Sequence, residues 1–272
     1  TPDSLVQLLL DSALEPVVAD RVAGCRTSEE KAEAILSITT CDPSVGSGHF
    51  IIAAAHRLAH HLARYRTGDS EPAPEDYQSA LRDVIRRCVY GVDMNPMAAE
   101  LCKVSLWIES MEPGKPLSFL DQHIQVGNSL VGCTPSLLAG GLPDSAFKPI
   151  EGDESKAVSA LKSRNKTERK HREQGQGFIA FGTEETSDLA DQAAALDAVD
   201  DDDVSSVWAK ADRYAELRQD PLWRRRKLAS DAWCAAFVWR KDGGDLSDDC
   251  PTDADIQAML VEDDYADRNP DQ

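Results

Sequence analysis

Hydrophobic positions in the first half of the chain alternate between helical spacing and short apolar runs. Apolar side chains recur every three or four residues in segments 4–18, 28–36, 49–62, 75–87 and 96–111, which predicts a helix over each. Pro2 and Pro96 suit the first turn of a helix, where a missing N–H costs nothing. Between these segments lie the apolar runs 38–41, 88–92 and 124–126, which are typical of buried strands.

Strands that alternate with helices predict a parallel sheet with right-handed crossover connections. We therefore expect residues 1–150 to form an α/β domain, with a Rossmann-like parallel sheet and flanking helices. Each strand in such a sheet ends at the same edge, and ligands bind beyond that edge because the loops diverge there.

The character of the sequence changes after about residue 150. Segment 151–173 is highly charged, segment 174–182 is a glycine-containing break, and an acidic run at 200–203 separates two alanine-containing segments. Residues 204–239 outline two amphipathic helices, and a loop at 242–251 precedes a last helix near 256–260. We expect residues 151–272 to form a charged, mostly helical insertion or cap.

The aromatic residues of that region allow two interpretations. Their helical spacing favours packing in a core, whereas nearby arginines would also suit a channel in which bases stack on the rings. The core interpretation needs fewer assumptions. The residues concerned are Trp208, Tyr214, Trp223 and Trp233.

Charge changes this picture, because the formal net charge is −19 and such a chain as a whole repels a polyanion. Basic stretches do occur at 162–172 and 224–227, where solvated helix faces and DNA contacts are alternative interpretations. If a polyanion such as double-stranded DNA is a partner, the charge therefore places its contacts mainly in regions outside this chain.

Cysteine usage and hydropathy indicate a cellular setting. The seven cysteines form no CxxC pair, which disfavours a disulfide framework and a zinc ribbon, and Cys41 and Cys102 are expected to be small core residues. No apolar stretch approaches the roughly 18 residues of a membrane span, and no secretory pattern opens the sequence. These features predict a soluble, cytoplasmic protein without membrane contact.

The first expected strand is followed by a glycine turn, Asp42-Pro43-Ser44-Val45-Gly46-Ser47-Gly48. Glycines there allow the backbone to approach a ligand, and the amides that open the next helix would face it. Asp42 is suited either to accept hydrogen bonds from a ligand amine or to position the loop. The plainer alternative is a tight turn that uses glycine for steric reasons alone.

Asp93 and Asn128 end the second and third expected strands. A carboxylate at that position can accept both hydroxyls of a ribose, and an amide can pair with an adenine edge, although a helix cap and a turn residue are the common alternatives. Two carboxylates at one edge would repel a pyrophosphate, whereas a cofactor with an amine and a sulfonium would be attracted.

Together these motifs resemble those of N6-adenine DNA methyltransferases, in particular the large enzymes of type IIG restriction-modification and phage-defence systems. The stretches that carry the resemblance are Asp42 to Phe50, Tyr90-Gly91-Val92-Asp93-Met94-Asn95-Pro96, Gly127-Asn128-Ser129-Leu130 and Thr1-Pro2-Asp3-Ser4. The resemblance spans residues 1–150 and implies S-adenosyl-L-methionine as cofactor. The cofactor-binding residues that it implies are Thr1, Asp42, Pro43, Ser44, Gly46, Gly48, Asp93, Met94, Asn128 and Ser129.

The sequence departs from that family at the catalytic motif. Family members hold the flipped adenine with an Asn-Pro-Pro-aromatic motif at the end of a fourth strand, which places the adenine amine in line with the sulfonium methyl. This sequence contains no such motif, since Asn269-Pro270-Asp271-Gln272 lacks the second proline and the aromatic residue. We therefore assign no catalytic residue here. Either the chain represents part of a protein, or catalysis is supplied elsewhere.

Three functions remain open at this point. The first is the cofactor-binding part of a site-specific adenine-N6 DNA methyltransferase, with nuclease or other defence-system subunits as partners. The second is a non-catalytic cofactor-binding module that regulates a partner, and the third is a methyltransferase for RNA, protein or a small molecule. No metal site is expected, because His56 and His60 have helical spacing suited to zinc but no obvious third ligand.

Overall fold

The computed structural model describes residues 2–174, 183–197 and 199–261. The chain divides into two compact units, of which the first comprises Thr1–Ser129 and Ala195–Tyr214 and the second comprises Leu130–Ala194 and Ala215–Gln272. The first unit is thus formed by two separate parts of the sequence, a long one that ends at Ser129 and a short later one. The functional division near residue 150 that the sequence suggests stays a proposal.

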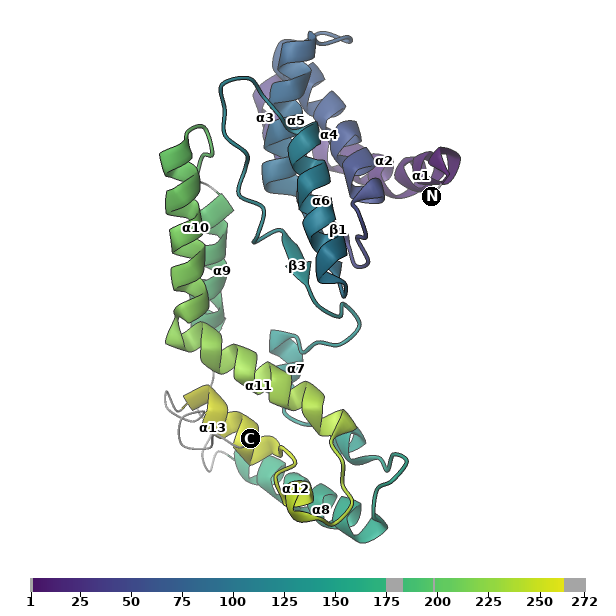
Figure 1. Ribbon diagram of the computed structural model, residues 1–272, viewed down its shortest axis with the longest axis vertical. Helices are drawn as coiled ribbons and strands as arrows, with labels where there is room; N and C mark the ends of the chain where they lie inside the picture. The colour runs from purple at the N-terminus through teal and green to yellow at the C-terminus, as the bar shows by residue number, and fades with distance from the viewer. Residues whose placement is uncertain (1, 175–182, 198, 262–272) are drawn as a thin grey trace. The chain divides into compact units, whose positions relative to one another are not determined.

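The first unit contains the sheet and its helices (Figure 1). In chain order its elements are α1 (Asp3–Leu9), the π-helical turn η1 (Leu10–Leu14), α2 (Glu15–Val22), α3 (Ser28–Leu36), β1 (Thr40–Asp42), α4 (His49–Thr67), α5 (Pro74–Cys88), β2 (Val89–Asp93), α6 (Pro96–Glu109) and β3 (Ile124–Val126), followed by the end of α9 (Thr183–Asp197) and much of α10 (Val204–Gln219).

The three strands form a parallel sheet in the order β1-β2-β3. Asp42 pairs in register with Gly91, and Asp93 pairs with Val126, so the carboxyl ends of all three strands lie at one edge. The prediction of strands alternating with helices is confirmed, and the arrangement is compatible with an α/β methyltransferase fold. The assignment of this sheet to the Rossmann-like folds stays a prediction, because the described sheet has three strands.

Local sequence explains where the helices begin. Thr27 and Glu30 form a reciprocal capping box at the start of α3, and the Asn95 side chain accepts a hydrogen bond from the Met97 amide at the start of α6. The single helix expected over residues 4–18 is instead interrupted by η1. Pro16 lies just beyond this turn and lacks an N–H, so the ordinary hydrogen bond to residue 12 cannot form and the helix widens there.

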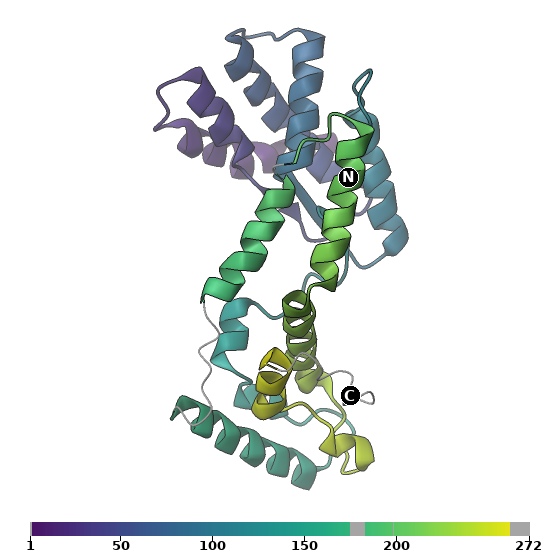
Figure 2. The same ribbon diagram turned by 90° about the vertical axis from the view of Figure 1, so that its left-hand side faces the viewer.

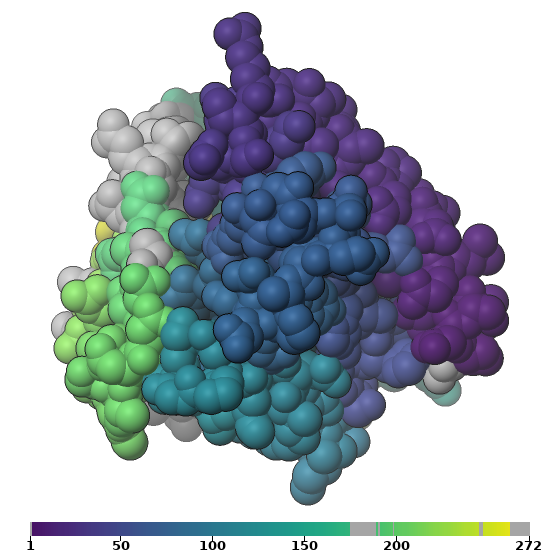
Figure 3. Space-filling view, turned by 90° about the horizontal axis from the view of Figure 1, so that it is seen from above, coloured from purple at the N-terminus to yellow at the C-terminus, as the bar shows by residue number. Residues whose placement is uncertain are grey.

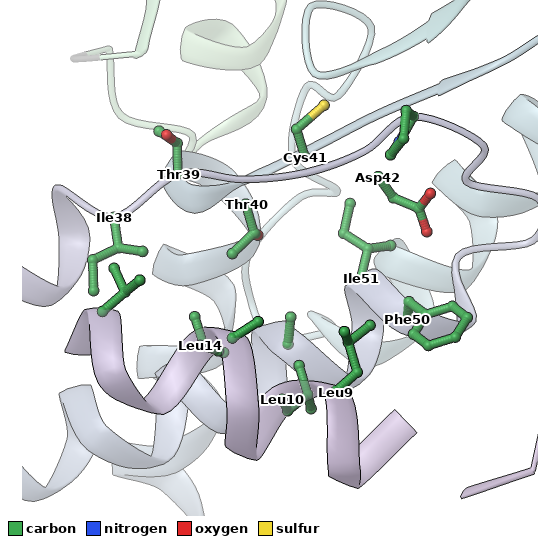
Figure 4. A pocket seen from close by; sticks show the side chains of 14 residues that line it. Leu9, Leu10, Leu14, Ile38, Thr39, Thr40, Cys41, Asp42, Phe50 and Ile51 are labelled. Carbon is green, nitrogen blue, oxygen red and sulfur yellow. The ribbon is translucent and has the colours of Figure 1, made fainter. Parts of the chain in front are cut away.

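The core of this unit lies between the sheet and helices α3, α4 and α5. Helix α4 buries one complete face, whose members are Ile51, Ala54, Ala55, Leu58, Ala59, Leu62 and Ala63. Cys102 is buried, as expected. The same expectation for Cys41 is wrong, because Cys41 is exposed: alternation along β1 turns its side chain away from the helix that carries Leu9, Leu10 and Leu14 (Figure 4).

The returning segment Ala195–Tyr214 is attached to the sheet by a polar network. Asp197 accepts hydrogen bonds from Tyr90 of β2 and from Gln122, and it pairs with the buried His123. Burial would raise the pKa of Asp197, but the hydrogen bond and charge of His123, followed by the bond from Tyr90, outweigh burial and lower it. In the space-filling view this green segment lies against the blue and teal surface (Figure 3).

Acidic residues after α9 extend this network. Asp201 is buried and pairs with the fully buried Lys210, while its backbone carbonyl accepts a hydrogen bond from Arg82. Asp200 pairs with Arg86 of α5 at 2.7 Å. The acidic run at 200–203 is therefore an anchor for the segment and not only a separator between helices.

All described regular elements of the second unit are helical (Figure 2). Its core gathers Leu142, Phe147, Trp233 and Ile256, and the buried Asp253 carboxylate accepts hydrogen bonds from the Leu142 amide and from Arg172. The elements are α7 (Pro135–Gly140), the 3-10 turn η2 (Asp144–Phe147), α8 (Ser155–Glu173), α11 (Pro221–Val238), α12 (Asp245–Asp248) and α13 (Asp253–Val261), together with the remaining parts of α9 and α10.

The aromatic residues of the later helices differ in environment. Trp233 is buried, as the helical spacing predicts, but Trp208 is 67% exposed, so the expectation that it packs in a core is wrong. Helix α10 packs through Lys210 and Tyr214, and Trp208 lies on its outer side. Within the described ranges, no helix combines the length and apolar composition needed to cross a membrane.

Candidate nucleoside-cofactor site

The turn after β1 is shaped by its own carboxylate and by two glycines. Asp42 Oδ1 accepts a hydrogen bond from the Ser44 amide at 2.9 Å, which folds the chain back directly after the strand. Gly46 and Gly48 adopt φ values of 54° and 94°, which side chains other than glycine rarely tolerate. A Cβ at Gly46 would face open space, so a ligand has room to approach the backbone there.

Asp93 connects the end of β2 to this turn. Its Oδ2 accepts a hydrogen bond from the Gly46 amide at 2.9 Å, and its Oδ1 accepts one from the Asn95 amide at 2.8 Å. These two backbone donors, with Asn95 the stronger, lower the pKa of the Asp93 carboxyl. Asp93 is therefore ionised at neutral pH, and each oxygen keeps a further lone pair for a ligand.

The end of β3 reaches the same region. The Gly127 amide donates to the backbone carbonyl of Asp93 at 2.9 Å, and the Ser129 hydroxyl donates to the carbonyl of Pro43 at 2.6 Å. Asn128, between these two residues, is exposed. The structure thus brings together the three strand ends that the sequence singles out. Thr1 lies outside the described residues, and Met94 is 70% exposed beside Asp93.

A cavity of about 460 Å³ lies on one side of the turn (Figure 4). Its walls are mainly apolar side chains of η1, of α4 and of the segment that leads into β1, including Leu10, Phe50 and Ile38. Asp42 and Pro43 line it, whereas Asp93, Asn128 and Ser129 do not. Hydrogen bonds connect the turn after β1 with the ends of β2 and β3. This cavity, however, is not a hollow that Asp42, Asp93 and Asn128 line together.

Sequence reasoning missed one steric requirement of the site. A Cβ placed on Gly91 of β2 would lie 2.8 Å from a methyl carbon of Val45, and Val45 is buried with its amide bonded to the Val92 carbonyl at 3.0 Å. Only glycine at position 91 lets the turn lie flat against β2. The tripeptide Tyr90-Gly91-Val92 carried the signal, because a glycine inside a strand often marks a close approach of another backbone.

We expect Gly91→Ala to displace the glycine turn and to lower the free energy of unfolding, because the new methyl group overlaps the Val45 side chain. Urea denaturation should show a loss of about 1 to 3 kcal/mol. The double variant Gly91→Ala/Val45→Ala should be less destabilised than the sum of the two single changes. Strict additivity of the two losses would show that this contact does not govern the turn.

Two of the four histidines of α4 have hydrogen-bonding partners on neighbouring elements. His56 contacts the Tyr77 hydroxyl at 2.6 Å and the Glu109 carboxylate at 3.0 Å, and His61 lies 3.2 Å from Glu15. Among the residues that the structure describes, no cluster of three or more potential metal ligands occurs.

The donors and acceptors at the strand ends fit a cationic nucleoside cofactor. Asp93 offers a partly exposed carboxylate at a strand end, the turn offers glycine backbone, and α4 begins directly after it with amides that have no partner inside the helix. Asp42 adds a second negative charge at the turn. In open parallel sheets, ligands bind beyond the carboxyl ends of the strands, which is where these groups lie.

Comparison with known proteins makes the class of protein more specific. No family model matches the chain, and no solved structure matches it. The chain is 26% identical to a protein of Methanocaldococcus jannaschii named as a type II restriction enzyme and methyltransferase, over 48% of this chain and 14% of that protein. It is 27% identical to the adenine-specific methyltransferase PglX of Streptomyces coelicolor, over 48% of this chain and 10% of PglX.

Both similarities are distant, and they support a methyltransferase family for the chain. The matched region amounts to a small part of each relative's own length. The activity, substrates and partners of a whole protein are accordingly matters of proposal.

Proposed function

We propose that this chain is the S-adenosylmethionine-binding part of a site-specific DNA adenine-N6 methyltransferase in a restriction-modification or phage-defence system. The observation that carries the proposal is the direct link between the glycine turn and the acidic strand end, from the Gly46 amide to Asp93 Oδ2. The names of the two relatives, a restriction enzyme with methyltransferase and an adenine-specific methyltransferase, support adenine as the methylated base and a restriction-modification setting.

Each strand-end residue has a role in this proposal. Asp93 accepts the two ribose hydroxyls with its remaining lone pairs, and Asn128 pairs with the edge of the cofactor's adenine. Gly46 allows close approach of the methionine portion, whose amine Asp42 attracts, while the buried Gly48 provides the positive φ that the turn needs next to Cys102. Thr1, Pro43, Ser44, Met94 and Ser129 complete the proposed set, as the motif resemblance implies. The bound cofactor supplies a methyl group made electrophilic by its sulfonium.

The chain itself positions the cofactor and leaves the target adenine to other parts of the protein. Its sequence holds no Asn-Pro-Pro-aromatic motif to grip a flipped base, and Asn269 with Pro270 lies outside the described residues. A net charge of −19 also requires that double-stranded DNA be bound by basic regions elsewhere. Nuclease or other defence-system subunits are the proposed partners.

The test is calorimetric titration of the chain with S-adenosylmethionine, followed by a methyl-transfer assay on unmodified double-stranded DNA. We expect saturable one-to-one binding and no transfer by the chain alone. Absence of binding would overturn the cofactor role. Transfer to RNA, protein or a small molecule, with none to DNA in a longer protein that carries the catalytic motif, would overturn the substrate.

A second candidate is a non-catalytic module that binds S-adenosylmethionine and regulates a partner nuclease or methyltransferase. The missing catalytic motif favours it. A protein that extends beyond the present residues would distinguish the two functions. An Asn-Pro-Pro-aromatic sequence together with cofactor-dependent methylation would identify the enzyme. Cofactor-dependent control of a partner without methylation would identify the regulatory module.

A further inference from the structure

Helix α6 is apolar on two opposite faces. Ala99, Cys102 and Leu106 are buried against the rest of the first unit, where α6 packs on β2, β3, α4 and α5. Four large apolar side chains on the other face are 44 to 66% exposed. A helix with apolar residues on both sides is usually buried on both sides. The exposed residues, which we name the α6 outer face, are Met97, Leu101, Val104 and Ile108.

The spacing of the α6 outer face defines the shape of what would cover it. Its members are separated by four, three and four residues, and Met94 before the helix and Met111 after it continue the same alternation. This is the a and d pattern of a coiled-coil seam, which accommodates the side chains of one facing helix. A flat sheet or an extended peptide would not match a stripe of this period.

Methionine content points to a binding surface. Three of the four methionines of the chain, at positions 94, 97 and 111, belong to this stripe, and each is more than half exposed. Methionine is flexible and polarisable, and it is used frequently on surfaces that adapt to a bound helix. An exposed stripe of this length on a monomer usually marks an interaction site.

Charges around the stripe indicate what kind of helix fits. The charged side chains of α6 and of the loop 110–123 are four carboxylates and two lysines; each lysine pairs with at least one carboxylate of the same region, which leaves an excess of two negative charges. Glu100, at a position flanking the seam, is well exposed. Two copies of this chain would place acidic flanks against each other, and each copy carries a net charge of −19. Self-association is therefore disfavoured, and a helix with basic flanks is complementary.

We propose that the α6 outer face is a docking surface for an amphipathic helix of a partner protein, with apolar residues at its a and d positions and lysine or arginine at the flanking e and g positions. The four residues of the α6 outer face are not among those assigned to the cofactor, although Met94, which extends the stripe before the helix, is; the proposal does not rest on methyltransferase activity. α6 lies in front of the sheet in Figure 1.

The test uses synthetic helical peptides of about three heptads, the length at which such helices become stable enough to pair. One peptide has leucine at a and d with lysine at e and g, and the second has the same leucines with glutamate at e and g. Binding to the chain is measured by calorimetry at low salt. We expect the lysine peptide to bind about tenfold or more tightly than the glutamate peptide.

Two matched variants test whether the peptide binds to α6. Leu101→Asp interrupts the middle of the stripe, whereas Leu5→Asp changes a leucine of similar exposure on α1, at 55% against 50%. We expect loss of lysine-peptide binding in the first variant and unchanged binding in the second, with both retaining the circular dichroism of the parent. Equal binding of both peptides, or equal loss in both variants, would overturn the proposal.

Sedimentation of the chain alone provides a further check. We expect a monomer over the micromolar range. A concentration-dependent dimer that Leu101→Asp abolishes and Leu5→Asp preserves would show that a second copy covers the stripe, and it would overturn the assignment to a basic partner helix.

Discussion

Asp93→Ala is expected to reduce the affinity for S-adenosylmethionine by about tenfold or more, because charge-assisted hydrogen bonds to the ribose hydroxyls would be lost. The carboxylate is partly exposed at the end of β2, and its lowered pKa keeps it ionised through the neutral range. Affinity should therefore be independent of Asp93 titration between about pH 5 and 8. Calorimetric titration of parent and variant measures the change.

The effect of this substitution must be separated from a disturbance of the turn, since Asp93 also accepts the Gly46 amide. A suitable pair of probes is 5′-methylthioadenosine and its 2′,3′-dideoxy analogue. The parent should prefer the probe with ribose hydroxyls, and the variant should bind both equally. Asp69→Ala, in the exposed loop between α4 and α5, is the control and should behave as the parent. An unchanged preference in Asp93→Ala would exclude the ribose role.

Regular elements of the first 126 residues follow closely from the sequence, because their apolar periodicity also determines their burial. Helix α3 has the predicted bounds, and β2 ends at Asp93 as the switch in period indicates. The sequence predicts that Asp93 and the glycine turn lie at the same edge of the sheet, but it does not predict the hydrogen bond between Asp93 and Gly46. Parallel strands bring their ends to one edge, but a hydrogen bond from the turn to the next strand depends on backbone geometry.

Long-range polar contacts were not predictable in the same way. Segment 200–203 looks like a solvated acidic loop in sequence, since nothing local shows that Arg82, Arg86 and Lys210 face it. Buried polar pairs are specified by partners that are far away in sequence, so periodicity contains no signal for them. For the same reason Trp208 was assigned to a core, although Lys210 is the side chain of α10 that becomes buried.

That buried pair gives the second large effect. Asp201→Ala is expected to lower the free energy of unfolding by about 3 to 5 kcal/mol, because it leaves the Lys210 ammonium buried without its carboxylate. Lys210 Nζ lies 3.3 Å from Asp201 Oδ1, and both side chains are almost completely buried. Burial lowers the pKa of Lys210 and Asp201 opposes that change, so removal of the carboxylate favours the neutral amine. Urea denaturation of parent and variant measures the loss.

Two further variants identify burial as the cause. Asp202→Ala removes a neighbouring aspartate whose partner, Lys115, is more exposed, and the loss should be below about 1 kcal/mol. Asp201→Ala/Lys210→Met removes both buried charges, so it should be more stable than Asp201→Ala alone; the Phe119 amide loses its acceptor in both variants, and this loss does not affect the comparison. If the double variant were the less stable of the two, the unpaired lysine would not be the source of the loss. The returning segment would then depend chiefly on Asp197 and Asp200 for its attachment to the sheet.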